Sequence, residues 1–396
     1  MKILLVNKYL YSVGGAENYM LNIGEKLIEL GHEVQYFGIE STKNVVGNNV
    51  MEFAKCYENS KIKRFFPWQM IYSKGAYKKM KKVLIDFNPD IVHMNNINYQ
   101  LTSSIIDACK DMNIPVVMTI HDPQLICPNH RLYIESKNEI CTKCINGDFK
   151  NCYKERCMAN SKIKSYIGYR ESVYTHKNKK YDYISKFICP SEFIGNLLIR
   201  GGYSKEKILT LRNFCNLSRP SFVEKEDYIL YYGRISIEKG ISTLLSALPK
   251  NIKLIIAGTG PMVKDIPNSD NVEYVGFKHK NELTNLIAKA KFTVYPSEWY
   301  ENSPLSIIES ISLGTPVIGT NCGGIKELIQ DGKNGLLFEN KNILDLQNKI
   351  LKLFFDKDLY DSILKNCGIQ PEEFKIDFYI MRLLDIYKEI INAKTN

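Results

Sequence analysis

The sequence lacks any apolar run approaching the ~18 residues that a membrane-spanning helix requires. It has no low-complexity tract, and its 44% hydrophobic and 24% charged residues are typical of a globular protein. The opening segment, MKILLVNKYLYS, has only four consecutive apolar residues before Asn7 and Lys8. We therefore interpret it as a buried first strand rather than a signal peptide, and we expect a cytoplasmic protein.

Acidic residues are absent from residues 61–82, a stretch rich in Lys, Arg and aromatic side chains. The whole chain has a formal net charge of +10, which favours an anionic partner. A basic, aromatic-bearing stretch is typical of a peripheral contact with anionic membrane, and equally of a solvated helix whose apolar side packs in the core. No nucleic-acid-binding motif accompanies the charge, so we expect no nucleic-acid partner.

At 396 residues the chain is longer than one hydrophobic core usually extends, so two domains are expected. Short apolar runs alternate with helical patterns on both sides of a polar stretch at residues 217–227. This alternation predicts an α/β protein with two doubly wound, Rossmann-like domains. We expect the domains at residues 1–216 and 217–373, followed by a helix at 374–396 that packs back on the N-terminal domain.

Glycines and cations follow two of the predicted strands, and ligands bind at the carboxyl ends of strands in open parallel sheets. Gly14 and Gly15 open a helix, where they permit close backbone approach and the free amides attract phosphate. Arg234 and Lys239 follow the strand YILYYG, and a guanidinium fork beside an ammonium group suits a diphosphate. A purely structural role is the alternative for each motif.

Two carboxylates eight positions apart follow the predicted strand FTVYPS. We expect Ser303 to cap the next helix and Pro304 to be its first residue. Glu301 then lies at the strand end beside the free amides of the helix. Glu309 lies inside the helix, where it can accept hydrogen bonds from ribose hydroxyls. The helix start between them attracts phosphate, so the spacing suits a sugar nucleotide.

Taken together, these segments resemble the retaining GT-B glycosyltransferases of family 4, of the group 1 type. The matching segments are Gly14-Gly15, residues 233–240, Glu301-x7-Glu309, and residues 312–317, 323–328 and 334–338. The resemblance implies two Rossmann-like domains that face each other across a cleft, where a nucleotide-diphosphate sugar binds. It implies sugar transfer with retention of anomeric configuration, and no cofactor or metal for catalysis.

The resemblance also implies roles for individual residues. His121 and Glu301 would be catalytic, with the neutral His121 imidazole near the sugar or the leaving phosphate and Glu301 in contact with the transferred sugar. The donor-binding residues would be Gly14, Gly15, Arg234, Lys239, Ser303, Leu305, Ser306 and Glu309. Where many members have a Glu-Gly-Phe-Gly run, this chain has Glu301-Asn302-Ser303-Pro304, so the identity of the sugar does not carry over.

Two further candidates concern the acceptor side and a metal. His93, which we expect at the carboxyl end of the strand in the run DIVHMNN, and Asp122 are the candidates for the acceptor side. A cysteine-rich insertion at residues 127–157 contains Cys141, Cys144, Cys152 and Cys157, a spacing that a structural zinc could use. Reduced structural thiols are the alternative, because disulfides are disfavoured in the cytoplasm.

The predicted function is a glycosyltransferase in polysaccharide or glycoconjugate biosynthesis, acting on a glycan or lipid-linked acceptor at the inner face of the cell membrane. One alternative is a transferase with a small soluble acceptor. Another is a non-catalytic sugar-nucleotide-binding subunit of a glycan-assembly complex. The presence of Glu301, Arg234, Lys239 and His121 in one chain argues against a non-catalytic subunit.

Overall fold

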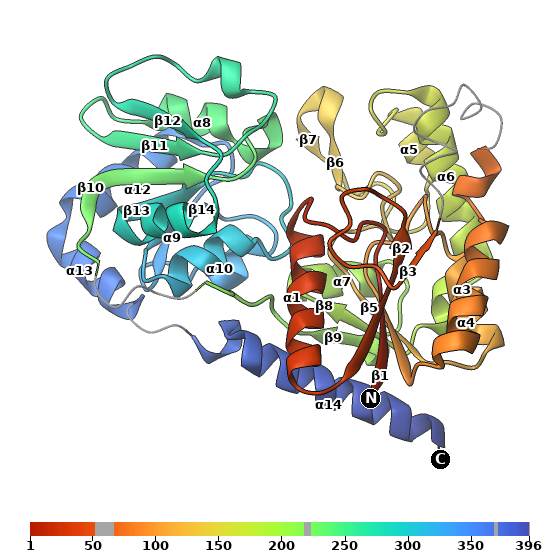
Figure 1. Cartoon of the computed structure of the whole chain (residues 1–396). Coiled ribbons are helices and arrows are strands. Elements are labelled where there is room, and N and C mark those ends of the chain that lie inside the picture. The colour runs from red at the N-terminus through yellow and green to blue at the C-terminus, as the bar shows by residue number, and fades with distance from the viewer. Residues whose placement is uncertain (52–66, 218–222, 368–370, 396) are drawn as a thin grey trace. The chain divides into compact units, whose positions relative to one another are not determined.

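The computed structural model describes residues 1–51, 67–217, 223–367 and 371–395, which form two compact units (Figure 1). The first unit contains Met1–Lys137, Cys141–Leu211 and Ile380–Asn396, and the second contains Asn138–Ile140 and Arg212–Tyr379. The main division therefore lies at Leu211–Arg212, whereas the sequence suggested 216–217.

The first unit is built on a parallel sheet that, within the described residues, has seven strands in the order β3-β2-β1-β4-β5-β8-β9. Its central strands are short apolar runs buried on both faces, as expected where helices cover a sheet on both sides. The strands are β1 (Lys2–Val6), β2 (Glu33–Ile39), β3 (Asn49–Met51), β4 (Ile91–Met94), β5 (Val116–Thr119), β8 (Lys186–Cys189) and β9 (Ile208–Thr210).

Local signals set the limits of the helices between these strands. Helix α3 (Lys74–Phe87), for example, begins where the Ser73 hydroxyl accepts from the Ala76 amide and ends at Asn88 in the left-handed conformation. The other helices of this part of the chain are α1 (Gly15–Glu29), α4 (Ser104–Asp111), α5 (Lys150–Lys154), α6 (Lys162–Lys177) and α7 (Glu192–Arg200). The cysteine-rich insertion adds the short strands β6 (Tyr133–Ile134) and β7 (Glu139–Ile140).

The second unit has a parallel sheet with the strand order β12-β11-β10-β13-β14-β15. Alternate residues of the central strand β10 pack into hydrophobic clusters on opposite faces, with Ile229 and Tyr231 in one and Tyr228, Leu230 and Tyr232 in the other. The strands are β10 (Glu226–Tyr232), β11 (Lys253–Ala257), β12 (Val272–Gly276), β13 (Ala290–Tyr295), β14 (Val317–Thr320) and β15 (Gly335–Phe338).

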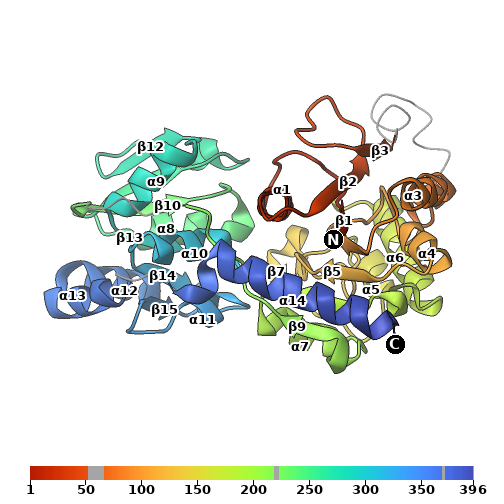
Figure 2. The same cartoon turned by 60° about the horizontal axis from the view of Figure 1, so that its bottom comes forward.

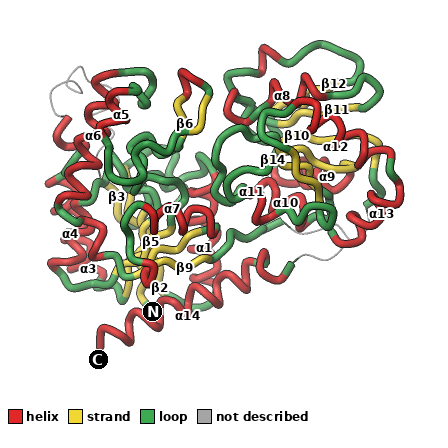
Figure 3. The backbone as a smooth tube through the Cα atoms, turned by 180° about the vertical axis from the view of Figure 1, so that it is seen from behind, coloured by secondary structure: helices red, strands yellow, loops and turns green. Residues whose placement is uncertain are grey.

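Helices accompany this sheet as they do the first (Figure 3). They are α8 (Ile241–Ala247), α9 (Lys280–Lys289), α10 (Leu305–Ser312), α11 (Ile325–Leu328), α12 (Ile343–Phe355) and α13 (Lys357–Asn366). The strand order reverses direction along the chain between β10 and β13, the kind of position where ligands bind in doubly wound sheets. A ligand site is therefore expected at the loops after β10 and β13.

The chain ends in one long helix, α14 (Ile376–Thr395), where the sequence predicted a helix over 374–396 (Figure 2). From Ile380 onward this helix belongs to the first unit. Its buried residues recur at helical spacing, with Tyr379, Leu383 and Tyr387 each 0% exposed. Among the described residues, no helix combines the length and the apolar character needed to cross a membrane.

Candidate functional site

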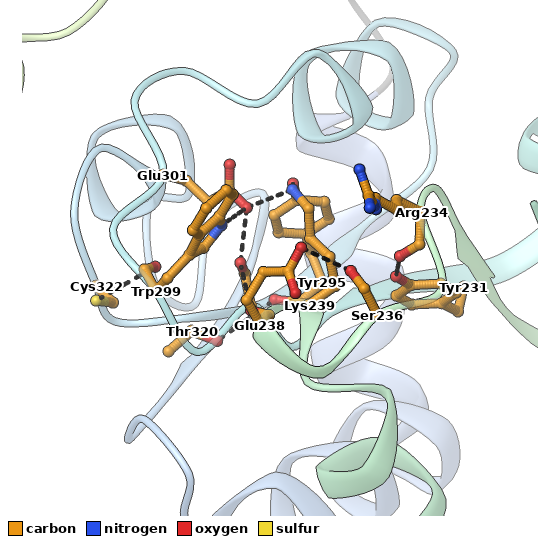
Figure 4. A network of polar contacts seen from close by, with 11 residues as sticks. Tyr231, Arg234, Ser236, Glu238, Lys239, Tyr295, Trp299, Glu301, Thr320 and Cys322 are labelled. Atoms are coloured by element: carbon orange, nitrogen blue, oxygen red, sulfur yellow. Dashed lines mark hydrogen bonds and ion pairs between the residues drawn. The ribbon is translucent and has the colours of Figure 1, made fainter. Parts of the chain in front are cut away.

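The loops after β10 and β13 are held together by their backbones (Figure 4). Residues Ile237–Lys239 form one turn of 3-10 helix, and Gly240 follows with φ +70°. A Cβ atom on Gly240 would lie 1.9 Å from the Pro296 carbonyl oxygen, so only glycine permits this close approach. The Glu298 amide donates to the Glu238 carbonyl at 2.9 Å, which fixes the two loops side by side.

Glu301 is the centre of the polar contacts between these loops. One of its carboxylate oxygens, Oε1, accepts from Lys239 Nζ at 2.5 Å, Trp299 Nε1 at 2.6 Å and Ser297 Oγ at 2.7 Å. Burial by itself raises the pKa of Glu301, but the Lys239 charge and the three hydrogen bonds outweigh it, and the net pKa is lowered. The carboxyl group is therefore ionised at neutral pH.

Lys239 is enclosed on several sides. Its ammonium group also donates to Tyr295 Oη at 3.1 Å and lies 5.4 Å from the ring centroids of both Tyr295 and Trp299. The sequence predicted Lys239 beside Arg234 on a diphosphate and Glu301 apart from it on the sugar. The structure instead joins Lys239 and Glu301 in one ion pair, and the partners Ser297, Tyr295 and Trp299 were not predicted.

Arg234 lies in the same loop as Lys239 but in a different environment. Its side chain is exposed, and only its backbone carbonyl is bonded, by the Tyr231 hydroxyl at 2.5 Å. Within the described part of the chain no hydrogen bond or ion pair is recorded for its guanidinium group. Arg234 thus presents a charged fork to solvent at the carboxyl end of β10.

The turn after β14 holds the backbone of the Glu301 loop. The Gly324 amide donates to the Glu301 carbonyl at 2.8 Å. A Cβ atom on Gly323, whose φ is +59°, would lie 2.6 Å from that carbonyl oxygen. Gly323 therefore has a steric role, because it lets this turn approach the Glu301 backbone.

The start of α10 differs from the sequence prediction. Pro304 is the N-cap with extended backbone, the helix begins at Leu305, and no side chain caps it. Ser303, expected to be the cap, is buried, and its hydroxyl has no hydrogen-bond partner. The amides of Leu305 and Ser306 precede the first recorded intrahelical bond, which Ile307 donates to the Pro304 carbonyl.

Glu309 lies on α10, as predicted, in an environment opposite to that of Glu301. No hydrogen bond or ion pair is recorded for its carboxyl group among the described residues. Burial raises the pKa of Glu309 to about 7. The protein thus keeps a carboxyl group with a raised pKa on a helix whose first two amides, those of Leu305 and Ser306, have no recorded hydrogen bond among the described residues.

In the first unit, His121 follows β5 directly. Its Nε2 lies 2.8 Å from Asn95 Oδ1, and its ring meets the Tyr19 ring edge-on at 4.8 Å. Asn95 donates its amide nitrogen to the Val6 carbonyl, which turns Oδ1 toward His121 and assigns the imidazole proton to Nε2. Burial lowers the pKa of His121 to about 3, so the ring is neutral, as the sequence analysis supposed.

His93 is not where the acceptor-side prediction put it. It lies within β4 rather than after it, it is 0% exposed, and both ring nitrogens are hydrogen-bonded, to Tyr387 and Thr119. The run DIVHM continues as strand to Met94, which draws His93 into the core. The other acceptor-side candidate, Asp122, lies in the loop after β5 and accepts from the Gln124 amide at 3.0 Å.

Gly14 and Gly15 form the start of α1, with Gly14 as the N-cap. The φ of Gly14 is −165°, which is extended backbone that any residue adopts. A Cβ atom there would touch only Glu17 Oε2, at 3.6 Å. The fold itself therefore does not require glycine at position 14.

The predicted zinc cysteines lie around one small cavity in the insertion. It is lined by Cys127, Cys141, Cys144, Cys152 and Cys157 together with Pro128, Asn129 and Tyr133. All five thiols are free, and Cys152 and Cys157 are hydrogen-bonded to each other. In their present arrangement, no three of the described His, Cys, Asp and Glu side chains form a group that could hold a metal ion. The zinc site stays a prediction.

Comparisons with known proteins cover nearly the whole chain. Residues 13–219 match Glycosyltransferase Family 4, and residues 216–367 match Glycosyl transferases group 1. An uncharacterized glycosyltransferase of Methanocaldococcus jannaschii is 25% identical over 98% of this chain and 99% of its own length. The alpha-monoglucosyldiacylglycerol synthase of Acholeplasma laidlawii is 22% identical over 98% of this chain and 97% of its own length.

A solved structure is similar over the same extent. Anabaena Alr3699/HepE, determined with UDP and with UDP-glucose, has a TM-score of 0.67 at 17% identity, covering 98% of this chain and 100% of HepE. At this identity the likeness concerns the fold alone. It confirms the predicted GT-B class, with two Rossmann-like domains.

The raised pKa of Glu309 predicts how stability depends on pH. Between pH about 4.5 and 7 the folded protein keeps a proton that the unfolded chain releases, so folding becomes less favourable as pH rises. Glu309→Gln has no such titrating group. As pH rises from about 5 to 8, its thermal midpoint should therefore rise by about 2–4 °C relative to that of the parent protein. This corresponds to roughly 1 kcal/mol of unfolding free energy after discounting partial exposure of Glu309. Glu301→Gln is the control, because the Glu301 carboxyl is ionised throughout that range. Parallel pH curves for the parent and Glu309→Gln would contradict the assignment.

Metal analysis tests the zinc prediction. If the cysteine thiolates turn inward to the ~2.3 Å that zinc requires, protein prepared without chelators should contain stoichiometric zinc that Cys144→Ser loses. Cys189→Ser, which alters a buried thiol in β8, should keep the metal. Zinc absent from the parent protein would leave reduced structural thiols as the account of the cluster.

Proposed function

Because the chain belongs to Glycosyltransferase Family 4, we propose that it transfers a sugar from a nucleotide-diphosphate sugar, with retention of configuration, to a glycan or lipid-linked acceptor. The observation that carries the proposal is the cluster at the carboxyl ends of β10 and β13. There an exposed guanidinium, an ion-paired carboxylate and a helix start with unbonded amides lie on one set of interlocked loops.

The groups of this cluster fit the successive parts of a donor. The free fork of Arg234 and the first amides of α10 supply hydrogen-bond donors for a diphosphate, and Lys239 adds positive charge nearby. Within the described part of the chain, no neighbour is recorded as using the acceptor capacity of Glu309, which suits the hydroxyls of a ribose.

Glu301 is suited to the sugar because its two oxygens differ. Oε1 receives all three recorded hydrogen bonds, and none is recorded for Oε2 in the described part of the chain. A carboxylate held ionised by Lys239 stabilises positive charge as it develops at the anomeric carbon. Its ion pair makes it a weak nucleophile, so we assign it an electrostatic and positioning role.

In the first unit, His121 offers a neutral ring. By the family pattern it contacts the transferred sugar, and the lowered pKa supports that role because a neutral imidazole adds no charge beside the developing cation. The acceptor remains a matter of analogy. The name of the Acholeplasma relative describes a glucosylated diacylglycerol as its product, which supports testing lipid acceptors first.

The basic stretch provides a second, independent reason to test lipids. Residues 61–66 lie outside the described residues, but Trp68 is 61% exposed, and Lys78, Lys79 and Lys82 are exposed on α3. The apolar side of α3 packs in the core, as the structural alternative predicts. We propose that Trp68 and these lysines form a peripheral contact with anionic membrane on the cytoplasmic side.

Kinetics of two variants test the proposed function. A panel of nucleotide sugars, starting with UDP-glucose, identifies the donor by thermal stabilisation of the protein. Glu301→Gln should then lower kcat by roughly ten- to a thousand-fold with little change in nucleotide affinity. Glu309→Gln should mainly raise the KM for donor, because the ribose is remote from the bond that breaks. Donor binding without transfer or hydrolysis in the parent protein would instead favour a non-catalytic subunit.

Vesicle sedimentation tests the membrane contact. The protein should bind vesicles containing anionic lipid and release them as salt is added, because surface attraction is screened over ~10 Å at 0.1 M. Replacing Lys78, Lys79 and Lys82 by Gln should weaken binding about tenfold or more, at roughly 1 kcal/mol per charge. Replacing the exposed Lys352, Lys357 and Lys365 by Gln is a control with the same change of charge. Equal binding to neutral and anionic vesicles would reject the proposal.

A further inference from the structure

A chain of buried hydrogen bonds in the first unit runs from the last helix to the neighbourhood of His121. The Tyr387 hydroxyl on α14 lies 2.6 Å from His93 Nδ1, and His93 Nε2 lies 2.7 Å from Thr119 Oγ1. Thr119 Oγ1 lies 2.9 Å from the hydroxyl of Tyr19 on α1, whose ring packs against His121. The side chains of Tyr387, His93 and Thr119 are fully buried.

The two hydrogen bonds of His93 are coupled in direction because its ring is neutral. Burial, together with the nearby His121, lowers the pKa of His93 to about 3, so the ring carries one proton. One ring nitrogen therefore donates and the other accepts. If Nε2 holds the proton, it donates to Thr119, and Nδ1 accepts from Tyr387. If Nδ1 holds it, both bonds reverse. Loss of the Tyr387 hydroxyl would leave Nδ1 buried without its partner, which alters this balance.

The contacts at the other end carry this order to His121. The Tyr19 ring stands edge-on to His121 at an interplanar angle of 72°, while Asn95 holds Nε2 of the imidazole. The two contacts fix the ring from two sides. An apolar core could pack these strands without the cost of burying four polar groups, so the polar chain calls for a reason other than packing.

We propose that Tyr387 is a positioning residue for His121. Its hydroxyl is the partner of His93 Nδ1 and couples the tautomer of His93 to Thr119 and Tyr19, and this chain holds the His121 ring in the orientation used with the sugar. The inference rests on the role proposed above for His121. It makes α14 part of the machinery of the site, although its residues do not touch the substrate.

The test compares two tyrosines that each lose a buried hydroxyl. Tyr387→Phe breaks the chain, whereas Tyr360→Phe removes a hydroxyl that donates to the Lys291 carbonyl at 3.0 Å in the second unit. Both should lower the unfolding midpoint by a similar small amount. Tyr387→Phe should lower kcat about tenfold at an unchanged KM for donor, because misorientation of one group slows the chemical step. Tyr360→Phe should keep the parent kcat.

Variants of Thr119 give the same information if Tyr387→Phe does not fold. Thr119→Val breaks the chain in its middle, and Thr119→Ser keeps the hydroxyl. The Val variant should therefore lose kcat and the Ser variant should retain it. Where Tyr387→Phe folds, its effect on kcat and that of Thr119→Val should not add, because both interrupt one chain. Full additivity, or loss of kcat in Thr119→Ser equal to that in Thr119→Val, would overturn the proposal.

Nitrogen NMR of the histidine rings reads the tautomers without any transfer activity. Of the six histidines, His93 and His121 should change their ring signals in Tyr387→Phe, and none should change in Tyr360→Phe. If the parent protein transfers no sugar, the proposed function fails while this measurement still decides the positioning role. Unchanged His121 signals in Tyr387→Phe would overturn it.

Discussion

The ion pair between Lys239 and Glu301 is the contact on which the arrangement of the loops after β10 and β13 depends. The two residues lie 62 positions apart, on loops that follow different strands. Desolvation of this largely buried pair costs free energy, and further hydrogen bonds with Trp299, Ser297 and Tyr295 offset that cost. Gly240 and Gly323 permit the backbone approaches that bring the loops together. Removing either charge would leave the other buried without its partner, which costs more than a surface pair would.

Two carboxyl groups on neighbouring elements are set to opposite states by their surroundings. Lys239 and three hydrogen bonds lower the pKa of Glu301, whereas burial without a partner raises the pKa of Glu309 to about 7. Groups whose pKa values are pushed apart in this way often have different tasks in one site. An ionised Glu301 suits charge stabilisation, and Glu309 can gain from hydroxyl donors that are not recorded among the described residues.

The sequence could predict the features that local patterns control. Apolar runs and helical spacing predicted both sheets, and the spacing of Glu301 and Glu309 predicted one loop and one helix position. Local propensity failed at Ser303, because Pro304 takes an extended conformation and becomes the N-cap itself. It failed at His93, whose partner Tyr387 is 294 positions away. Such long-range partners leave no local signal in the sequence. The hydrogen bond from Trp299 to Glu301 also had no local signal.

The two units hold their candidate residues by different physical means. In the second unit, Glu301 is fixed by charge, and its neighbours compensate the cost of burying that charge. In the first unit, His121 is neutral and is fixed by Asn95 and by the edge of the Tyr19 ring. The neutral arrangement suits the role proposed for His121, because a charged ring would oppose positive charge that develops beside it. Without an ion pair, the orientation of a neutral side chain has to be set by directional hydrogen bonds. In the role proposed for it, the buried chain from Tyr387 through His93 and Thr119 supplies that direction, and this role would account for the polar groups at the centre of the sheet.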